Sequence, residues 1–252
     1  MPRELRLSEI STRSPEELEK DHVEKEYDEI TSEIADLQYK LKAEGKNNLL
    51  IIFQGMDASG KDGATHKVFK KCGVSGVQTY SFKKPTDKEF AHDFLWRVHK
   101  LTPGKGEVVI FNRSHYEDIL IQRVHNWIDE ERVNARVNAI NAFEELLVKD
   151  NNTTILKFYM HISEERQREK LQERIDVPRK NWKHKDADWE ERKLWKDYMS
   201  CYEDAIDRCN KVPWIIVPCD QRWYRNYFVA KKVYAALKKL DPQLPPIEKP
   251  NG

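Results

Sequence analysis

The sequence predicts a three-layer α/β fold with a parallel five-stranded sheet, and three observations support this prediction. Five short apolar runs are continuous rather than alternating, which is typical of strands buried on both faces. Long helical patterns separate these runs, so strands and helices alternate along the chain. The 252 residues contain no Gly- or Ser-rich linker and no internal repeat. We therefore expect a single domain over residues 1–252.

The positions of these patterns place the individual elements. The expected strands are Leu49–Gln54, Val77–Phe82, Glu107–Phe111, Thr154–His161 and Trp214–Pro218. The expected helices cover 15–44, 61–71, 86–100, 114–126, 131–149, 163–175, 186–209 and 222–240. Ser14 is the expected N-cap of the first helix, because Pro15 and two glutamates follow it. Residues 1–14 and the proline-rich end 241–252 are expected to be surface arms.

A basic segment interrupts the helical pattern between residues 174 and 185. It reads RIDVPRKNWKHK and contains five Lys or Arg residues and one Asp. Pro178 lacks a backbone N–H and cannot continue a helix, so the segment should be a turn between two helices.

The charge balance excludes some classes of partner. The chain carries 44 Lys and Arg residues against 43 Asp and Glu, a net charge of +1. This balance argues against a general attraction to nucleic acid or to an anionic membrane, so a polyanion would need a local basic patch. The sequence has no apolar run of ~18 residues and no signal-peptide core, and its four cysteines show no C-x-x-C spacing. We therefore expect a reduced, cytoplasmic protein.

The strongest motif follows the first expected strand. Residues 55–63 read GMDASGKDG and match the P-loop pattern G-x-x-x-x-G-K between a strand and a helix. The glycines permit a tight loop whose backbone N–H groups surround phosphate oxygens, and Lys61 and the helix N-terminus add positive charge. The alternative is an ordinary strand-to-helix turn. The residues expected to contact phosphate are Ala58, Ser59, Gly60, Lys61, Asp62 and Gly63.

Two acidic residues in this motif predict a metal ion. The P-loop pattern normally has Ser or Thr after the lysine, whereas Asp62 stands there. A carboxylate that faces phosphates is repelled unless a divalent cation lies between them. Asp57, inside the loop, is therefore expected to bind the metal or to orient it. Asp62 either belongs to the same site or is a first-turn acid that interacts only with the helix dipole.

The third expected strand ends in a polar cluster, FNRSHYED, at residues 111–118. Ligands of open α/β sheets bind beyond the carboxyl ends of the strands, so this cluster should face the P-loop. Arg113 offers a planar fork to a phosphate, and Asn112 stands where P-loop enzymes commonly have a metal-associated aspartate. We interpret His115 as structural rather than as a base, because phosphoryl transfer depends mainly on positioning and charge. The expected catalytic residues are Asp57, Lys61 and Arg113.

Together these motifs resemble the polyphosphate kinase 2 family. The similarity rests on GMDASGKDG, FNRSHYEDIL, HDFLWRVHK and NWKHKDADWEERKLWKDY, with support from SFKKPT and WYRNYFV, and covers about residues 40 to 245. It implies a thymidylate-kinase-like P-loop kinase fold with a helical lid at about 164–200. It also implies enzymes that move phosphoryl groups between inorganic polyphosphate and nucleotides with Mg²⁺, or with Mn²⁺ in its place. Many members form homo-oligomers, so a dimer or tetramer is expected.

The motif at the third strand resembles one branch of this family. The branch that uses nucleoside diphosphates typically has an aspartate at the position of Asn112, in a motif similar to FDRSWYNR. FNRSHYED instead resembles the branch that accepts both AMP and ADP, with other purine nucleotides as alternatives. Asn112 removes one carboxylate, so Asp57 is expected to contribute more of the metal binding.

The resemblance also assigns roles to the lid and to the acceptor side. A chain of phosphates needs closely spaced Lys and Arg, and the polyphosphate-binding residues implied in the lid are Arg168, Arg174, Lys180 and Lys183. The alternative for this segment is a solvated surface loop. The implied nucleotide contacts are Phe82, Lys83, Lys84, Pro85, Thr86, Asp93, Arg97, Asn112, Arg113, Tyr116 and Asp118. For Asp93 and Arg97 the alternative is an i,i+4 helix ion pair.

The sequence therefore predicts Mg²⁺-dependent, reversible transfer of the terminal phosphoryl group of polyphosphate to AMP or ADP, which yields ADP or ATP. The alternatives are a nucleoside monophosphate kinase with ATP as donor, a non-catalytic P-loop nucleotide-binding protein and a nucleic-acid-stimulated ATPase. The extended basic segment favours polyphosphate, because a triphosphate needs fewer cationic contacts. The near-zero net charge counts against nucleic acid.

Overall fold

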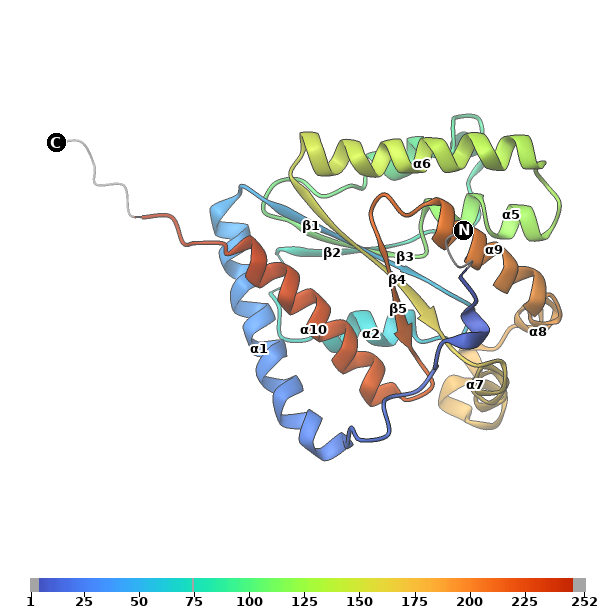
Figure 1. Ribbon diagram of the computed structural model, residues 1–252, viewed down its shortest axis with the longest axis horizontal. Helices are drawn as coiled ribbons and strands as arrows, with labels where there is room; N and C mark the ends of the chain where they lie inside the picture. Colours follow the sequence, from blue (N-terminus) through green and yellow to red (C-terminus); the bar gives the residue numbers. More distant parts are fainter. Residues whose placement is uncertain (1–4, 74, 247–252) are drawn as a thin grey trace.

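The computed structural model describes residues 5–73 and 75–246, which form one parallel sheet between two layers of helices (Figure 1). The strands are β1 Asn48–Gln54, β2 Val77–Ser81, β3 Val108–Asn112, β4 Thr153–His161 and β5 Trp214–Pro218. Their order is β2-β3-β1-β4-β5, and every neighbouring pair is parallel. The predicted class and sheet are confirmed, and each strand end lies within one residue of its predicted position.

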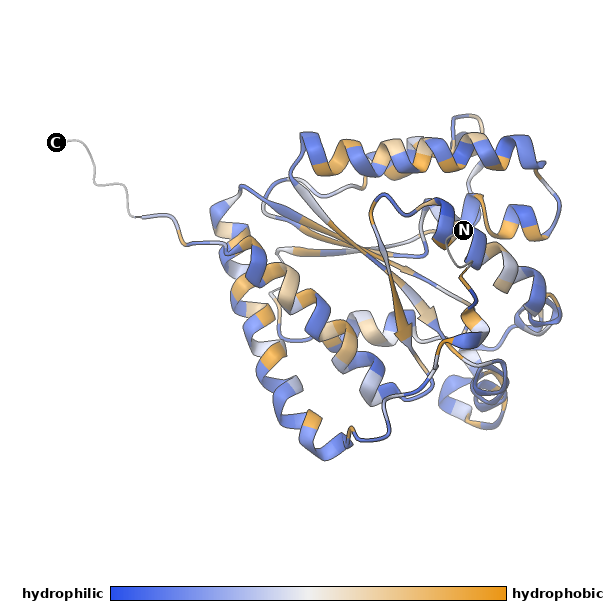
Figure 2. Ribbon diagram, in the orientation of Figure 1, coloured by the Kyte–Doolittle hydropathy of each residue, from blue (hydrophilic) through white to orange (hydrophobic). Residues whose placement is uncertain are grey.

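The continuous apolar runs form the centre of the molecule. All seven residues of β1 and all five of β3 are buried, and Figure 2 shows the strands as mainly hydrophobic. Helices cover both faces of these central strands, so apolar residues are not interrupted by the alternate polar residues of a strand with one solvent-exposed face. β2 lies at one edge of the sheet and is only partly buried. The core therefore sits at β1, whose carboxyl end leads into the P-loop.

Helices α1 Lys20–Glu44, α2 Lys61–Val68 and α10 Arg222–Leu240 cover one face of the sheet (Figure 1). The other face carries α5 Ile121–Val124, α6 Glu130–Asp150 and α9 Trp195–Arg208. Beyond the carboxyl ends of β4 and β5 lie α7 Glu164–Asp176, the 3-10 helix η3 Pro178–Lys183 and α8 Asp186–Lys193. The remaining short elements are η1 Leu7–Glu9, α3 Asp87–Phe90, α4 Trp96–His99 and η2 His115–Asp118. The predicted break at Pro178 is confirmed, because α7 ends two residues before it.

Several predicted helices are shorter or divided. The helix predicted over 86–100 is wrong, because Thr86 caps only the four-residue α3 and Asp93 then accepts a hydrogen bond from the backbone of Leu95. The helix predicted over 114–126 is likewise divided into η2 and α5, and the one over 186–209 is divided at Leu194. The first helix begins at Lys20 rather than at residue 15. The predicted N-cap at Ser14 is therefore wrong.

The N-terminal segment is not the surface arm that the sequence predicts. Leu7 is 1% exposed, and its backbone N–H donates to Glu203 of α9 at 2.7 Å. The Thr12 hydroxyl donates to the carboxylate of Asp220 at 2.7 Å, and the Asp220 N–H donates back to the Thr12 carbonyl at 3.0 Å. The segment thus lies against the carboxyl end of β5. Residues 243–246 are exposed, as predicted for the C-terminal arm, whereas 1–4 and 247–252 lie outside the described residues.

A fully buried ion pair lies between the sheet and α6. The Lys157 ammonium on β4 donates to Glu144 of α6 at 2.7 Å, and both side chains have no exposed surface. Lys157 also donates to the hydroxyl of Tyr116 at 2.8 Å, and that hydroxyl donates to Glu144 at 2.8 Å. The pair therefore joins β4, α6 and η2, which follows the predicted phosphate-facing end of β3.

We expect Glu144→Ala to lower the free energy of unfolding by about 3–5 kcal/mol, because the Lys157 ammonium would stay buried without its carboxylate. The measurement is urea denaturation followed by circular dichroism. The control is Glu145→Ala on the same helix, whose carboxylate is partly exposed and pairs with Lys149 and Lys211. That change should cost much less, because solvent screens the ion pairs of a partly exposed carboxylate. Equal losses in the two variants would contradict the structural role of the pair.

Candidate active site

The loop between β1 and α2 has the conformation that a phosphate cradle requires. Gly55, Ala58 and Gly60 have φ angles of 144°, 66° and 95°. A side chain at Gly55 would place its Cβ 2.8 Å from the backbone oxygen of Met160 on β4. Glycine is therefore needed there both for its backbone angle and for the close approach of β4. The turn ends where α2 begins at Lys61, so the positive end of the helix dipole points into the loop.

Lys61 lies folded over the loop. Its ammonium donates to the carbonyl oxygens of Gly55 at 2.6 Å and Met56 at 3.0 Å, and the residue is 7% exposed. Burial lowers the pKa of this ammonium, although the nearby Asp57 carboxylate favours its charged form. In this structure the Lys61 ammonium is hydrogen-bonded to two backbone carbonyl oxygens. An ionised phosphate oxygen would form a stronger hydrogen bond with this ammonium.

Asp57 and Arg113 form an ion pair across the site, with 2.5 Å between carboxylate oxygen and guanidinium nitrogen. Burial opposes ionisation of Asp57, but Lys61 and Arg113 outweigh it and lower the pKa of the carboxyl group. Arg113 has a φ angle of 60°, which is rare for a residue with a side chain. This turn directs the guanidinium back toward the P-loop, where it also lies 3.5 Å from Glu117.

Asp62 faces the end of β3 rather than acting only on the helix dipole. The Asn112 side-chain amide donates a hydrogen bond to its carboxylate. Asp57 and Asp62 thus place two carboxylates beside the P-loop, one on each side of Lys61 in sequence. Among the residues that the structure describes, no group of three or more His, Cys, Asp or Glu side chains could hold a metal ion. Any metal here would therefore need ligands beyond the protein.

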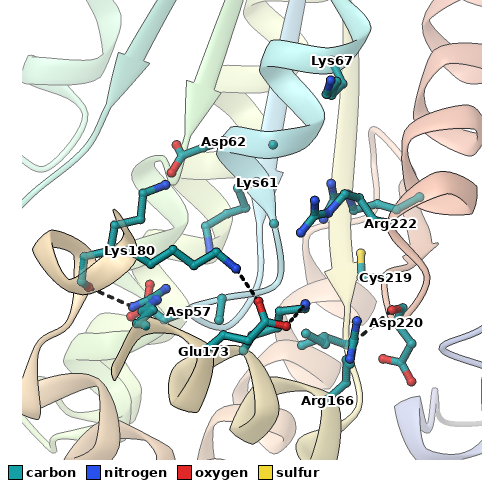
Figure 3. A pocket seen from close by; sticks show the side chains of 18 of the residues that line it. Asp57, Lys61, Asp62, Lys67, Arg166, Glu173, Lys180, Cys219, Asp220 and Arg222 are labelled. Carbon is teal, nitrogen blue, oxygen red and sulfur yellow. Dashed lines mark hydrogen bonds and ion pairs between the residues drawn. The ribbon is translucent and has the colours of Figure 1, made fainter. Parts of the chain in front are cut away.

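A cavity of about 340 Å³, which we call the phosphate cavity, lies over the P-loop (Figure 3). The cationic side chains that line it come from α2, α7, η3 and α10, and they are Lys61, Lys67, Arg166, Lys170, Arg174, Lys180, Lys183, Arg222 and Arg225. The acidic ones are Asp57, Asp62, Glu173 and Asp220. Ala58, Gly60 and Gly63 also line it, whereas Ser59 is buried beneath the loop. The local excess of positive charge is large although the whole chain is almost neutral.

Most cavity cations of α7 and η3 are paired with acids of α7 and α8. Lys170 and Lys180 both donate to Glu173, at 2.5 and 2.6 Å, and Arg174 pairs with Asp188 of α8. Burial opposes ionisation of Glu173, but the two lysines together outweigh it and lower the pKa of this carboxyl group to about 2. The predicted Arg174, Lys180 and Lys183 line the phosphate cavity, although Lys183 is exposed to solvent.

Arg168 does not line the phosphate cavity, unlike the other three predicted polyphosphate-binding residues. The side chain is exposed on α7 and is absent from the cavity lining. The cavity-facing cations of this helix are Arg166, Lys170 and Arg174, spaced four residues apart. That spacing matches the helical period and turns the intervening Arg168 to another face.

Arg225 is the main residue that sequence reasoning missed. Its guanidinium is 6% exposed and lies against the P-loop, where a Cβ added to Gly60 would collide with it. Its hydrogen bonds go to the side chain of Asn226, at 3.1 and 2.8 Å, rather than to a carboxylate. Burial accordingly lowers the pKa of this guanidinium. Arg225 lies within WYRNYFV, but the residue pattern of this helix does not distinguish it from an arginine on the protein surface.

Several of the residues predicted to bind nucleotide lie around Arg97. Its guanidinium donates to the backbone oxygen of Lys83 at 2.8 Å, lies 3.7 Å from Asp118 and stands over the ring of Phe82 at 5.4 Å. Phe82 in turn packs edge-on against Phe111. The i,i+4 ion pair with Asp93 does not form, because α4 starts only at Trp96. Lys83, Lys84, Thr86 and Asp93 are exposed and Pro85 is partly exposed.

Five of the predicted nucleotide contacts are buried, namely Phe82, Arg97, Asn112, Tyr116 and Asp118. Tyr116 has no exposed surface and is bound to Glu144 and Lys157, so its assignment to the nucleotide is wrong. Asp118 is 4% exposed and faces Arg97, so it can act on a ligand only through that residue. His115 has no exposed surface and lies 3.5 Å from Glu144, which agrees with a structural histidine.

The chain matches known proteins over nearly its whole length. The family described as polyphosphate kinase 2 matches residues 17–245. An AMP/ADP-polyphosphate phosphotransferase from Meiothermus ruber is 46% identical over 211 residues, 83% of this chain and 79% of that protein. An ADP-polyphosphate phosphotransferase from Rhodopseudomonas palustris is 38% identical over 226 residues, 84% of this chain and 78% of that protein.

A solved structure agrees with these sequence matches. The crystal structure of polyphosphate kinase 2 from Arthrobacter aurescens has a TM-score of 0.94 and 37% identity, and the match covers 97% of this chain and 89% of that chain. The predicted P-loop kinase fold is thereby confirmed.

We expect Gly60→Ala to reduce kcat/KM by at least about tenfold, because its Cβ would displace the Arg225 guanidinium and the φ angle of 95° would strain the loop. The control is Gly73→Ala, since a Cβ there meets no atom within 4 Å. Steady-state kinetics with thermal unfolding of both variants is the measurement. Unchanged activity in Gly60→Ala would exclude the proposed place of Arg225 at the loop.

Proposed function

The chain belongs to the polyphosphate kinase 2 family, and we propose that it transfers the terminal phosphoryl group of inorganic polyphosphate to AMP and ADP. The products are ADP and ATP. The observation that supports this function best is the phosphate cavity, in which nine Lys and Arg side chains surround a P-loop. A polymer with a charge on each unit needs such an array, whereas the phosphates of one nucleotide would leave much of it unmatched.

The geometry suits transfer by positioning and charge. The attacking oxygen of AMP or ADP is already ionised, so the reaction needs no strong general base. Lys61 and Arg113 would hold the transferred phosphoryl group between donor and acceptor, and Arg225 would neutralise the donor chain at Gly60. Because one phosphoanhydride bond is exchanged for another, the reaction should run in both directions.

The two carboxylates beside the P-loop fit a Mg²⁺ ion, or Mn²⁺ in its place. Mg²⁺ is commonly held by one or two carboxylates, with substrate phosphates and water as its other ligands. Asp57 would be the protein's main ligand and Asp62, fixed by Asn112, the second. Such an ion supplies charge screening between the donor and acceptor phosphates. The pairing of Asp57 with Arg113 keeps both groups in place before substrates bind.

The single domain carries a lid at about 164–200, made of α7, η3, α8 and the start of α9. Five of its cations line the phosphate cavity, so closure of the lid over the donor would exclude water and limit hydrolysis. Arg174 and Asp188 join α7 to α8 and would keep the lid together as it moves.

We also propose a cytoplasmic homo-oligomer, either a dimer or a tetramer. The four cysteines are free thiols, three of them buried, as expected in a reducing compartment. None of the helices in the described ranges is long and apolar enough to cross a membrane. The oligomer rests on the family resemblance, and light scattering after size exclusion would measure it.

The decisive assay uses purified protein with AMP or ADP, Mg²⁺ and polyphosphate in the absence of any nucleoside triphosphate. We expect ATP to form from ADP, and ADP followed by ATP to form from AMP. The parallel reaction with ATP and AMP but no polyphosphate measures the rival nucleoside monophosphate kinase. Activity only in that second reaction would assign ATP as the donor.

We expect Asp57→Asn and Lys61→Ala each to lower kcat by at least about 10²–10³-fold. The first removes the carboxylate that would bind the metal, and the second removes the ammonium that would face the transferred phosphoryl group. The fold should persist, since neither residue belongs to the sheet core, and thermal unfolding checks this. Lys40→Ala on the exposed face of α1 serves as the control for loss of a lysine. Near-normal turnover in either loop variant would contradict these assignments.

A further inference from the structure

Two surface grooves continue from the phosphate cavity. The first, which we call the α1–α10 groove, has a volume of about 430 Å³ and is lined by Lys20, Val23, Tyr27 and Trp223, among others. The second, the α7 groove, has a volume of about 600 Å³ and includes Arg13, Glu165 and Glu169. Arg166 and Arg222 line both grooves and the phosphate cavity as well. The three spaces therefore meet at these two arginines.

A polymeric donor requires such a continuation. Only the terminal unit reacts, so the rest of the chain must leave the phosphate cavity through an opening. We propose that polyphosphate leaves through the α1–α10 groove, which is thus a second binding segment for the unreacted part of the chain. This inference rests on polyphosphate being the donor, as proposed above.

Unpaired cations stand at the entrance to this groove. Lys67 lines both the phosphate cavity and the α1–α10 groove, but not the α7 groove. Within the described residues, neither Lys67 nor Arg222 forms an ion pair, and both are exposed. Figure 3 shows the two side chains from α2 and α10 on the side of the cavity away from Lys180. Four of the five cavity cations of α7 and η3 have acidic partners, whereas Lys67 and Arg222 are available to an anion that passes between them.

The charges of the two grooves differ. The α1–α10 groove is lined by Lys20, Lys67, Arg166 and Arg222 against the single acid Glu24. In the α7 groove the acids Glu165, Glu169 and Asp220 equal the arginines in number. A polyanion is attracted along the first groove and gains little along the second. The apolar walls formed by Val23, Tyr27 and Trp223 also lower the local dielectric, which strengthens attraction between the cations and phosphate.

The test measures binding rather than turnover. Isothermal titration calorimetry at low salt gives Kd for long-chain polyphosphate and for tripolyphosphate, which is too short to leave the phosphate cavity and follow the groove. We expect Lys20→Glu to weaken binding of the long chain by about three- to tenfold and to leave tripolyphosphate unchanged. Glu24→Gln should strengthen binding of the long chain. Both effects should fade at high salt.

Two charge reversals serve as matched controls. Arg13→Glu changes only the α7 groove, and Lys25→Glu changes an exposed position of α1 that lines neither groove. We expect both variants to bind the long chain as the parent protein does. A loss in Arg13→Glu that equals or exceeds the loss in Lys20→Glu would overturn the proposed route. If Lys25→Glu weakens binding of the long chain as much as Lys20→Glu does, general surface charge explains the effect, and the proposed route is overturned as well.

Further outcomes separate the route from the function. Normal ATP formation from polyphosphate, together with unchanged long-chain binding in Lys20→Glu, would overturn the route and leave the function intact. If the parent protein binds neither long-chain polyphosphate nor tripolyphosphate and forms no ATP, both the route and the proposed function are overturned. Weaker ATP binding in Lys20→Glu, with unchanged polyphosphate binding, would assign the groove to a nucleotide and overturn the proposal.

Discussion

A site for a polyanion must keep many positive charges close together even when no anion is bound. Each lysine and arginine in the phosphate cavity repels the others, and burial adds a further cost for those that are desolvated. The structure offsets this repulsion with acids placed among the cations, such as Glu173 between Lys170 and Lys180. The backbone of the P-loop does the same for Lys61 through two carbonyl oxygens. Phosphate binding is then an exchange of partners.

This exchange has a consequence for specificity. An incoming phosphate must compete with carboxylates that already satisfy the cations, so a short or weakly charged ligand gains little net free energy. Arg225 is different, because its partner is a neutral amide and its guanidinium lies against the P-loop glycine. The ends of the site nearest the loop and the α1–α10 groove therefore hold the least compensated cations, and a long chain that reaches both is favoured.

The sequence predicts the sheet and the P-loop well because both depend on local patterns. Continuous apolar runs determine buried parallel strands, and the spacing of glycines and Lys61 determines the loop. Predictions failed for residues whose side-chain position is determined by tertiary contacts. Tyr116 follows Arg113 by three residues, yet the buried Lys157–Glu144 pair takes its hydroxyl into the core. Arg225 comes from a helix more than 150 residues after the loop, and no local pattern reveals that approach.

The contacts of the N-terminal segment join residues that are far apart in the sequence, which has a consequence for the order in which the protein folds. Leu7, Thr12 and Ser14 are synthesised well before their partners Glu203, Asp220 and Gln221, which lie about 200 residues later in the sequence. These are contacts of very high sequence separation, which form late in folding because closing so long a loop costs entropy. Asp220 also accepts a hydrogen bond from the backbone of Ser163, which caps α7. The N-terminal segment and the start of α7 are therefore both held by Asp220, a residue that is synthesised only after β5.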